Sequence, residues 1–279
     1  MSQKVLLAKN LVELANLNLE EIPLEEICYL IAKEKYPALD PQIYRDRLDE
    51  FARRAHLRIG KVMGMRQLAI GLSQYLFEEE GFRGNTSDYY HPSNSFLNDV
   101  LDRREGIPIT LSILYIAIGK RLSLPVHGVG FPGHFLVRYE DPKGAFFVDP
   151  FHRGKVLSAE DCKHRLGDMY GDVLPFQHGF LDPSSHREIL LRMLTNLKII
   201  YMMKKDFAGA LQTLNQILLF TPFGSEEIKE RGMLYYHMEC FSQALKDLEV
   251  YLQRAPAAPD RPIVEGWIKE LRVKVSQIQ

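Results

Sequence analysis

The last third of the chain contains an internal repeat with an offset of 34 residues. Four positions carry it, because Tyr201, Ala210, Leu214 and Pro222 recur as Tyr235, Ala244, Leu248 and Pro256. The segments 205–211 and 239–245 align at the same offset. Since several aromatic, small and proline positions agree at one spacing, two unrelated amphipathic hairpins explain the pattern poorly.

This period and pattern are typical of the tetratricopeptide repeat, a pair of helices that buries its apolar face against the neighbouring pair. We therefore predict an all-α region over residues 188–279 with two repeats. Residues 261–278, which include Trp267, Ile268 and Leu271, are expected to form a helix that caps the array. Stacked repeats commonly present a concave groove, so we expect a protein or peptide partner to bind there.

Residues 1–90 are predicted to form a helical region that packs on the core that follows. Asp40 and Pro41 are typical of an N-cap and a first helical residue, which predicts a helix running to about residue 57. Another helix is expected from Met65 to Glu79, because glycines and polar loop residues follow it.

Residues 91–180 combine helical and strand patterns. A helix is predicted over residues 94–104, ended by Gly106, and a second helix should start near Pro108, because proline is favoured in a first turn. The second helix is apolar on nearly every side and is expected to be buried. Strands are predicted at 126–129, 131–139 and 145–148, and the Asp141-Pro-Lys-Gly turn joins the last two as an antiparallel hairpin.

A histidine and an aspartate fall on neighbouring strands of this predicted hairpin. They are His134 and Asp149, and whether they share a face depends on the strand register, which the sequence leaves open. Arg138 follows His134 at even spacing, so it could face the same site and bind a carboxylate. The alternative for Arg138 is a place on an exposed face of the sheet.

A cysteine at a helix start, followed by a histidine and an aspartate, forms a nucleophilic site. The helix end and the imidazole lower the pKa of the thiol, and the aspartate orients the imidazole. Here the helix start holds Pro108 and no cysteine, and its hydroxyls belong to Thr110 and Ser112. A hydroxyl could replace the thiol only within about 2.6–3.2 Å of the His134 ring. Ser112 is expected to lie too deep, and Thr110 could instead bond the backbone of the preceding turn.

Three stretches carry a resemblance to a known family. Residues 94–112, 132–138 and 149–151 together resemble the bacterial SirB family, whose members are transglutaminase-like proteins with C-terminal tetratricopeptide repeats. The resemblance covers almost the whole chain and implies an α+β fold, with a papain-like core in which the helix from Pro108 packs on a small antiparallel sheet. It also implies that His134 and Asp149 occupy the catalytic positions, and that the nucleophilic cysteine belongs at or next to Pro108.

Two functions of different classes follow from the missing cysteine. Removing a triad nucleophile costs about 10⁶ in rate in a protease, which favours a non-catalytic transglutaminase-like protein that acts as an interaction or regulatory module through its repeats. The alternative is a hydrolase or acyltransferase in which Thr110 or Ser112 acts with His134 and Asp149. A further binding hypothesis is a small-molecule sensor that uses His134 and Arg138.

Composition limits the partners and the location. The formal net charge is -1 and the pI is about 6.8, so we expect no nucleic-acid partner. No apolar run is long enough for a membrane span, and the three cysteines (Cys28, Cys162 and Cys240) lie far apart, which favours a reducing cytoplasm. No cofactor or metal is expected, because His127, His134, His152 and Asp149 match no standard ligand spacing.

Overall fold

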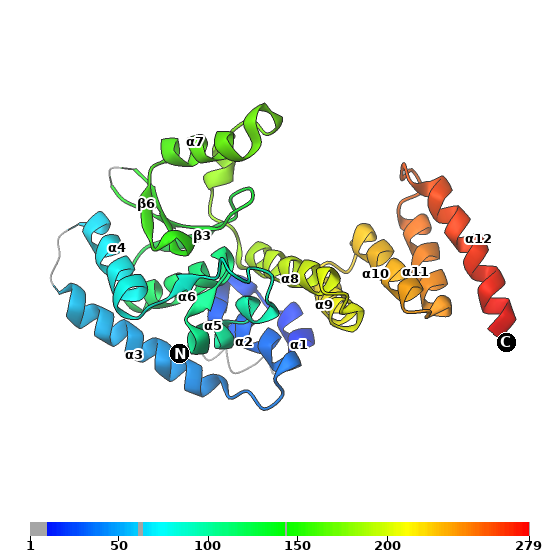
Figure 1. Cartoon of the computed structure of the whole chain (residues 1–279), viewed down its shortest axis with the longest axis horizontal. Helices are drawn as coiled ribbons and strands as arrows, with labels where there is room; N and C mark the ends of the chain where they lie inside the picture. The colour runs from blue at the N-terminus through cyan, green and yellow to red at the C-terminus, as the bar shows by residue number, and fades with distance from the viewer. Residues whose placement is uncertain (1–9, 61–63, 143, 279) are drawn as a thin grey trace. The chain divides into compact units, whose positions relative to one another are not determined.

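The computed structural model describes residues 10–60, 64–142 and 144–278. It divides the chain into two compact units, Met1–Met193 and Leu194–Gln279, and helix α8 (His186–Met203) crosses the boundary between them. Figure 1 gives the element labels. The finer boundaries near residues 90 and 180–188 stay a prediction, and residues 1–9 of the first region lie outside the described residues.

Helices dominate the first unit. Its α-helices are α1 (Leu11–Ala15), α2 (Leu24–Lys35), α3 (Pro41–Ile59), α4 (Met65–Gln74), α5 (Leu97–Arg103), α6 (Pro108–Arg121) and α7 (Ala159–Tyr170). Short helical turns are η2 (Leu19–Glu21), the π-helical η3 (Tyr75–Glu79), η4 (Pro92–Ser95), η5 (Pro150–His152), η6 (Gly171–Val173) and η7 (His178–Leu181).

Local chemistry sets several helix ends. The Asp40 side chain accepts a hydrogen bond from the Gln42 N–H at 2.9 Å, so α3 begins at the predicted residues. The helix predicted over 94–104 is shorter than expected. It is preceded by η4, and it ends at Arg103 because the next residue, Arg104, has a left-handed φ of 61°, so the glycine is not what ends it. The Arg104 guanidinium lies 4.6 Å from the Phe51 ring centroid and 4.4 Å from that of Phe82, which stabilises this conformation.

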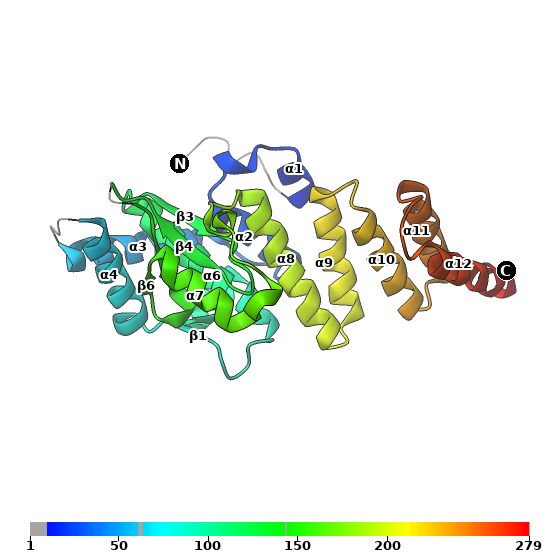
Figure 2. The same cartoon turned by 90° about the horizontal axis from the view of Figure 1, so that it is seen from above.

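Helix α6 lies at the centre of the first unit (Figures 1 and 2). It begins at Pro108 as predicted, and its residues from Pro108 to Gly119 are all buried. It packs against the helices α2, α3 and α5 and against strands that precede and follow it in the chain. Because the helix is apolar on nearly every side, it can be covered from all of these directions.

A four-stranded antiparallel sheet follows α6. Its strands are β3 (Val126–Val129), β4 (Leu136–Tyr139), β5 (Phe146–Asp149) and β6 (Lys155–Leu157), in that spatial order. The strand predicted over 131–139 starts only at Leu136. Pro132 has no N–H to give to a ladder, Gly133 has a φ of 66°, and the His134 N–H donates to the Phe131 carbonyl at 3.0 Å, so these residues form a turn. A separate parallel pair joins β1 (Arg83–Gly84) to β2 (Glu105–Gly106).

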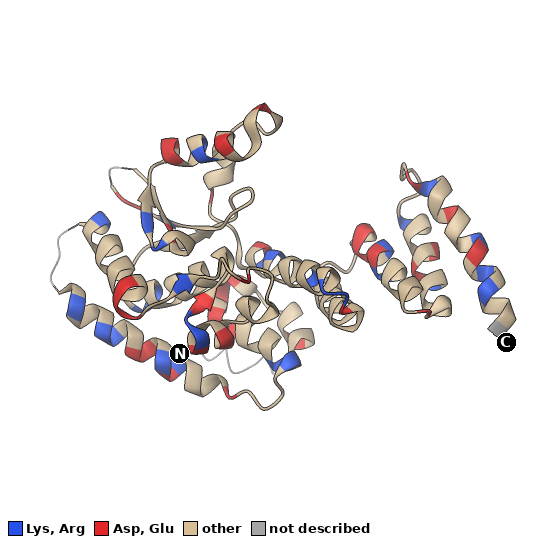
Figure 3. Cartoon of the chain, viewed as in Figure 1, with Lys and Arg blue, Asp and Glu red and all other residues tan. Residues whose placement is uncertain are grey.

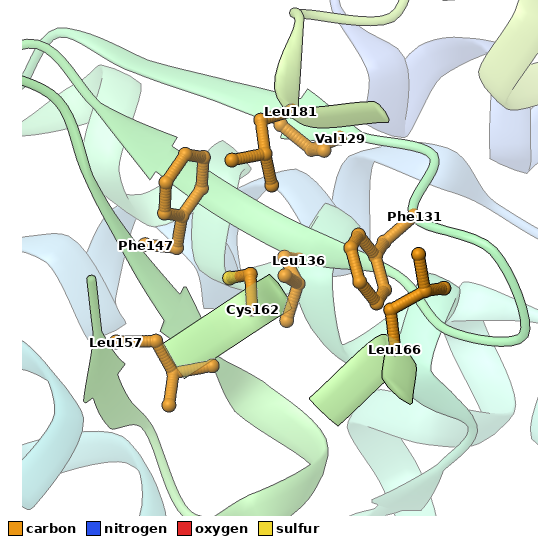
Figure 4. Close-up of a cluster of buried hydrophobic side chains, with 8 residues drawn as sticks. All are labelled: Val129, Phe131, Leu136, Phe147, Leu157, Cys162, Leu166 and Leu181. Atoms are coloured by element: carbon orange, nitrogen blue, oxygen red, sulfur yellow. The ribbon is translucent and has the colours of Figure 1, made fainter. Parts of the chain in front are cut away.

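The sheet lies between α6 and α7. On one face, the Tyr139 hydroxyl lies 2.9 Å from that of Tyr115 on α6. On the other face, Figure 4 shows apolar side chains of the sheet and the adjoining turns gathered against Cys162 and Leu166 of α7. This cluster comprises Val129, Phe131, Leu136, Phe147, Leu157, Cys162, Leu166 and Leu181, all buried. Because both faces of the sheet are buried, the register of its strands is fixed, and with it the position of the polar residues at the strand ends.

The second unit is entirely helical over its described residues. It contains the end of α8, followed by α9 (Phe207–Phe220), α10 (Ser225–His237), α11 (Phe241–Arg254) and α12 (Arg261–Ile278). Helices α10 and α11 pack as a pair, and α12 packs on α11. Their shared core comprises Ile228, Ala244, Leu248, Tyr251, Val264, Ile268 and Leu271. The predicted α+β fold, with a C-terminal repeat region, is confirmed.

Charged residues of both signs are distributed along the helices of each unit. Figure 3 shows Lys and Arg interspersed with Asp and Glu on α3, α10 and α12. Among the described helices, none combines the length and the apolar character that crossing a bilayer requires.

Candidate functional site

His134 and Asp149 meet at one end of the sheet. His134 lies in the turn just before β4, and Asp149 is the last residue of the antiparallel neighbour β5, so the two elements bring them to the same edge. His134 Nε2 lies 2.8 Å from Asp149 Oδ1. The side chain of His134 is 6% exposed and that of Asp149 is fully buried. The structure therefore brings together the histidine and the aspartate that the sequence singled out.

The Asp149 carboxylate accepts hydrogen bonds from other donors besides His134. His152 Nδ1 lies 2.8 Å from Asp149 Oδ2, and the His152 backbone N–H donates to Asp149 Oδ1 at 3.2 Å. Arg165, from α7, donates from Nη1 to the same Oδ2. Burial by itself would raise the pKa of Asp149, but the hydrogen bonds from His134, His152 and Arg165 lower this pKa well below its ordinary value. Asp149 is therefore an ionised acceptor.

The ionised carboxylate fixes the tautomer of His134. Because a carboxylate can only accept, the proton of the neutral ring lies on Nε2, and Nδ1 is left with a lone pair. Burial lowers the pKa of His134, and the attraction of Asp149 only partly offsets this. His134 is therefore a neutral imidazole at neutral pH, oriented to accept a proton at Nδ1, as a general base does.

The two hydroxyls at the start of α6 are bonded to the backbone. Thr110 Oγ1 donates to the Asn94 carbonyl at 2.7 Å and accepts from the Ile107 N–H at 3.1 Å. Ser112 Oγ lies 3.5 Å from the Phe135 carbonyl oxygen, at the limit of a hydrogen bond. Both residues are fully buried. Within the described part of the chain, neither hydroxyl has a hydrogen bond to His134.

The start of α6 contains no cysteine that could act in place of the Thr110 and Ser112 hydroxyls. The first helical position is Pro108, which is buried. Cys162 belongs to the apolar cluster under α7, where burial raises the pKa of its thiol to about 12 (Figure 4). Cys28 is likewise buried, and burial raises its pKa too. Both thiols are protonated at neutral pH, so neither is a reactive thiolate.

Arg138 is placed differently from the prediction. Since β4 begins only at Leu136, His134 and Arg138 do not share a strand. The Arg138 guanidinium donates to Glu140 Oε1 at 2.8 Å and to the Leu181 carbonyl at 3.0 Å. Its role in ligand binding stays a prediction.

Two further arginines hold the site, and the sequence did not single them out. Arg165 reaches Asp149 only because α7 covers the sheet. Arg192, on α8, donates from Nη2 to the carbonyls of Phe131 and His134, at 2.9 and 2.6 Å. Both contacts join residues distant in sequence, so no local pattern could have found them. His152 could be linked to Asp149 from the sequence, because it follows Asp149 by three residues, and the structure places it in the helical turn η5.

Comparisons with known proteins agree with this architecture. Residues 42–195 match the transglutaminase-like superfamily, and residues 197–267 match a tetratricopeptide repeat family. The chain is 34% identical to a UPF0162 protein of Xylella fastidiosa, over 92% of this chain and 93% of the relative. It is 30% identical to a UPF0162 protein of Pseudomonas aeruginosa, over 80% and 82%. It is 28% identical to mouse F-box only protein 21, over 66% of this chain and 31% of the relative. No solved structure gives a significant match.

Proposed function

The chain belongs to the transglutaminase-like superfamily, and on that premise we propose that its core is a non-catalytic scaffold and that its repeats bind a partner protein. The resemblance inferred from the sequence, a transglutaminase-like core followed by tetratricopeptide repeats, is thereby confirmed.

The observation that supports a non-catalytic core is the start of α6. Family resemblance puts a nucleophilic cysteine there, and this chain has Pro108 instead. The Thr110 hydroxyl directs its proton to a backbone carbonyl 2.7 Å away, so it is not activated by His134. The His134–Asp149 pair then has a base and an orienting carboxylate but no nucleophile between the base and a substrate.

The repeat unit offers a surface for a partner. On the part of α8 that belongs to this unit, Ile199, Met202 and Met203 lie on one helical face, and they are 45%, 38% and 57% exposed. Methionine adapts its shape to different partners, and exposed apolar residues that cluster mark interaction sites. We call these three residues the α8 strip, and its partner is a peptide or helix with an apolar face.

The binding proposal is tested with two charge-introducing variants of the α8 strip. The tagged full-length chain, Ile199→Glu and Met203→Glu are used to capture partners from lysate, with quantification by mass spectrometry. Val273→Glu is the matched control, because Val273 in α12 is 56% exposed and lies outside the strip. We expect the same proteins to be lost from both strip variants and kept by the control. Equal capture by all four chains would refute the strip as the binding surface.

The second candidate function is hydrolysis or acyl transfer with a hydroxyl nucleophile. It is favoured by one observation, the retained His134–Asp149 pair with a lone pair on Nδ1. This function would require Thr110 or Ser112 to leave its backbone carbonyl. Covalent trapping with a serine-directed reagent, abolished by His134→Ala, would support it.

A further inference from the structure

We propose that His134, Asp149 and His152 form a binding site for a divalent transition-metal ion, with Zn²⁺ as the best chemical match. One ligand atom from each residue lies within 4.8 Å of the other two. This inference is independent of the proposed function, because it concerns neither a nucleophile nor the repeats.

The donor set is chemically suited to such an ion. Two imidazole nitrogens and one carboxylate oxygen are ligands that Zn²⁺ binds at about 2.0–2.2 Å, often with a fourth position left for water. Ligands on one tetrahedral Zn²⁺ therefore lie about 3.3 Å apart. Both imidazole nitrogens already lie 2.8 Å from carboxylate oxygens of Asp149, so small movements suffice.

The same nitrogens that now donate to Asp149 become the ligand atoms. The ion takes the lone pairs of His134 Nε2 and His152 Nδ1, and each ring carries its proton on the other nitrogen. The carboxylate stays ionised, and the number of bound protons does not change. In this way the ion replaces two hydrogen bonds with coordinate bonds.

The three ligands are positioned by secondary structure and by hydrogen bonds, and one of them, His152, is exposed to solvent. Asp149 ends β5, and the backbone of the His134 turn is bonded to Arg192. His152 follows in η5, with its side chain 50% exposed. A buried carboxylate next to a half-exposed imidazole gives the ion both a strong ligand and a route of entry.

The Arg165 guanidinium competes with a metal ion for the Asp149 carboxylate. Its guanidinium occupies Asp149 Oδ2, and Arg165 Nη2 lies 3.2 Å from His152 Nδ1. A metal ion and a guanidinium repel each other, so the ion binds only when Arg165 moves away. The Arg165 side chain is 26% exposed and can turn toward solvent. Removing the guanidinium should therefore strengthen metal binding, whereas removing a ligand should weaken it.

The experiment measures Zn²⁺ affinity by competition with a chromophoric chelator, using the metal-free full-length chain. Co²⁺ is added in parallel, because its visible absorption reports the coordination geometry. His152→Ala removes a ligand at little risk to folding, and Arg165→Met removes the competitor. His164→Ala is the matched control, since it deletes another histidine, one that is exposed on α7.

We expect one Zn²⁺ per chain, affinity at least about tenfold weaker in His152→Ala, and affinity about fivefold or more stronger in Arg165→Met, the loss of one competing ion pair. His164→Ala should bind as the unmodified chain does. Equal affinity of His152→Ala and the unmodified chain would overturn the proposal. So would weaker binding by Arg165→Met, because the guanidinium would then not compete with the ion.

Discussion

Replacing Asp149 with asparagine tests how much the polar network at the sheet edge stabilises the first unit. The variant keeps the volume of the side chain and its acceptor toward His134, but it removes the charge. His134, His152 and Arg165 then surround a neutral amide, and the amide N–H₂ faces donors instead of accepting from them.

The magnitude follows from the burial of each partner. Breaking a buried ion pair by removing one side costs about 3–5 kcal/mol, and an unsatisfied buried polar group costs about 1–3 kcal/mol. Here the His152 and Arg165 side chains are 50% and 26% exposed, so water recovers part of their loss. We therefore expect Asp149→Asn to lower the free energy of unfolding by about 2–3 kcal/mol. In a unit of this size that is a fall in Tm of about 4–12 °C.

The assay uses a feature of the chain that separates its two units. Its single tryptophan, Trp267, lies in α12 of the second unit, so tryptophan fluorescence reports that unit. Far-UV circular dichroism reports both units. We expect Asp149→Asn to lower the Tm seen by circular dichroism, and the Trp267 transition shows whether the second unit unfolds together with the first.

Asp168→Asn is the control, because Asp168 is an exposed carboxylate on the neighbouring helix α7. It should change the free energy of unfolding by no more than about 0.5 kcal/mol. If Asp149→Asn and Asp168→Asn have the same Tm, the network does not stabilise this edge of the sheet.

Three further predictions concern the first unit. The pKa of folded His134 lies below its ordinary value, so the contribution of His134 to stability is present above about pH 6.5 and is lost as pH falls through the folded pKa. The Tm of His134→Gln should therefore fall less steeply below pH 6.5 than that of the unmodified chain. Parallel profiles of Tm against pH would contradict this. Gly133→Ala should cost about 1–3 kcal/mol in chemical denaturation, since φ is 66° and the added methyl would lie 2.6 Å from Met169 Cε. Leu136→Ala should cost about 2–5 kcal/mol by the same measurement, because Leu136 is fully buried under α7 (Figure 4), and a cost below 1 kcal/mol would contradict this packing.

Features set by neighbouring residues could be predicted from the sequence. The starts of α3 and α6 depend on Asp40, Pro41 and Pro108, whose effects on the backbone are local. The repeat helices were visible because the same small and apolar positions return after one period. These parts of the fold need no knowledge of distant contacts.

Two kinds of feature were not predicted. The first is local: the sequence analysis expects His134 within a strand, but Pro132 and Gly133 form a turn before it, so the even spacing does not link His134 to Arg138. The second kind depends on residues that are distant in sequence. Arg165 joins Asp149 only after α7 has packed on the sheet. The cluster of His134, Asp149 and His152 has no standard ligand spacing along the chain, because a strand end, a turn and a helical turn supply its members.

Covalent trapping tests whether the core has a working nucleophile. The full-length chain and His134→Ala are incubated with a serine-directed fluorophosphonate, and intact-mass spectrometry measures the adduct. We expect no adduct that depends on His134, since the Thr110 hydroxyl donates to the Asn94 carbonyl and Ser112 is buried against the Phe135 carbonyl. A stoichiometric adduct on Thr110 or Ser112 that disappears in His134→Ala would show that the core is catalytic.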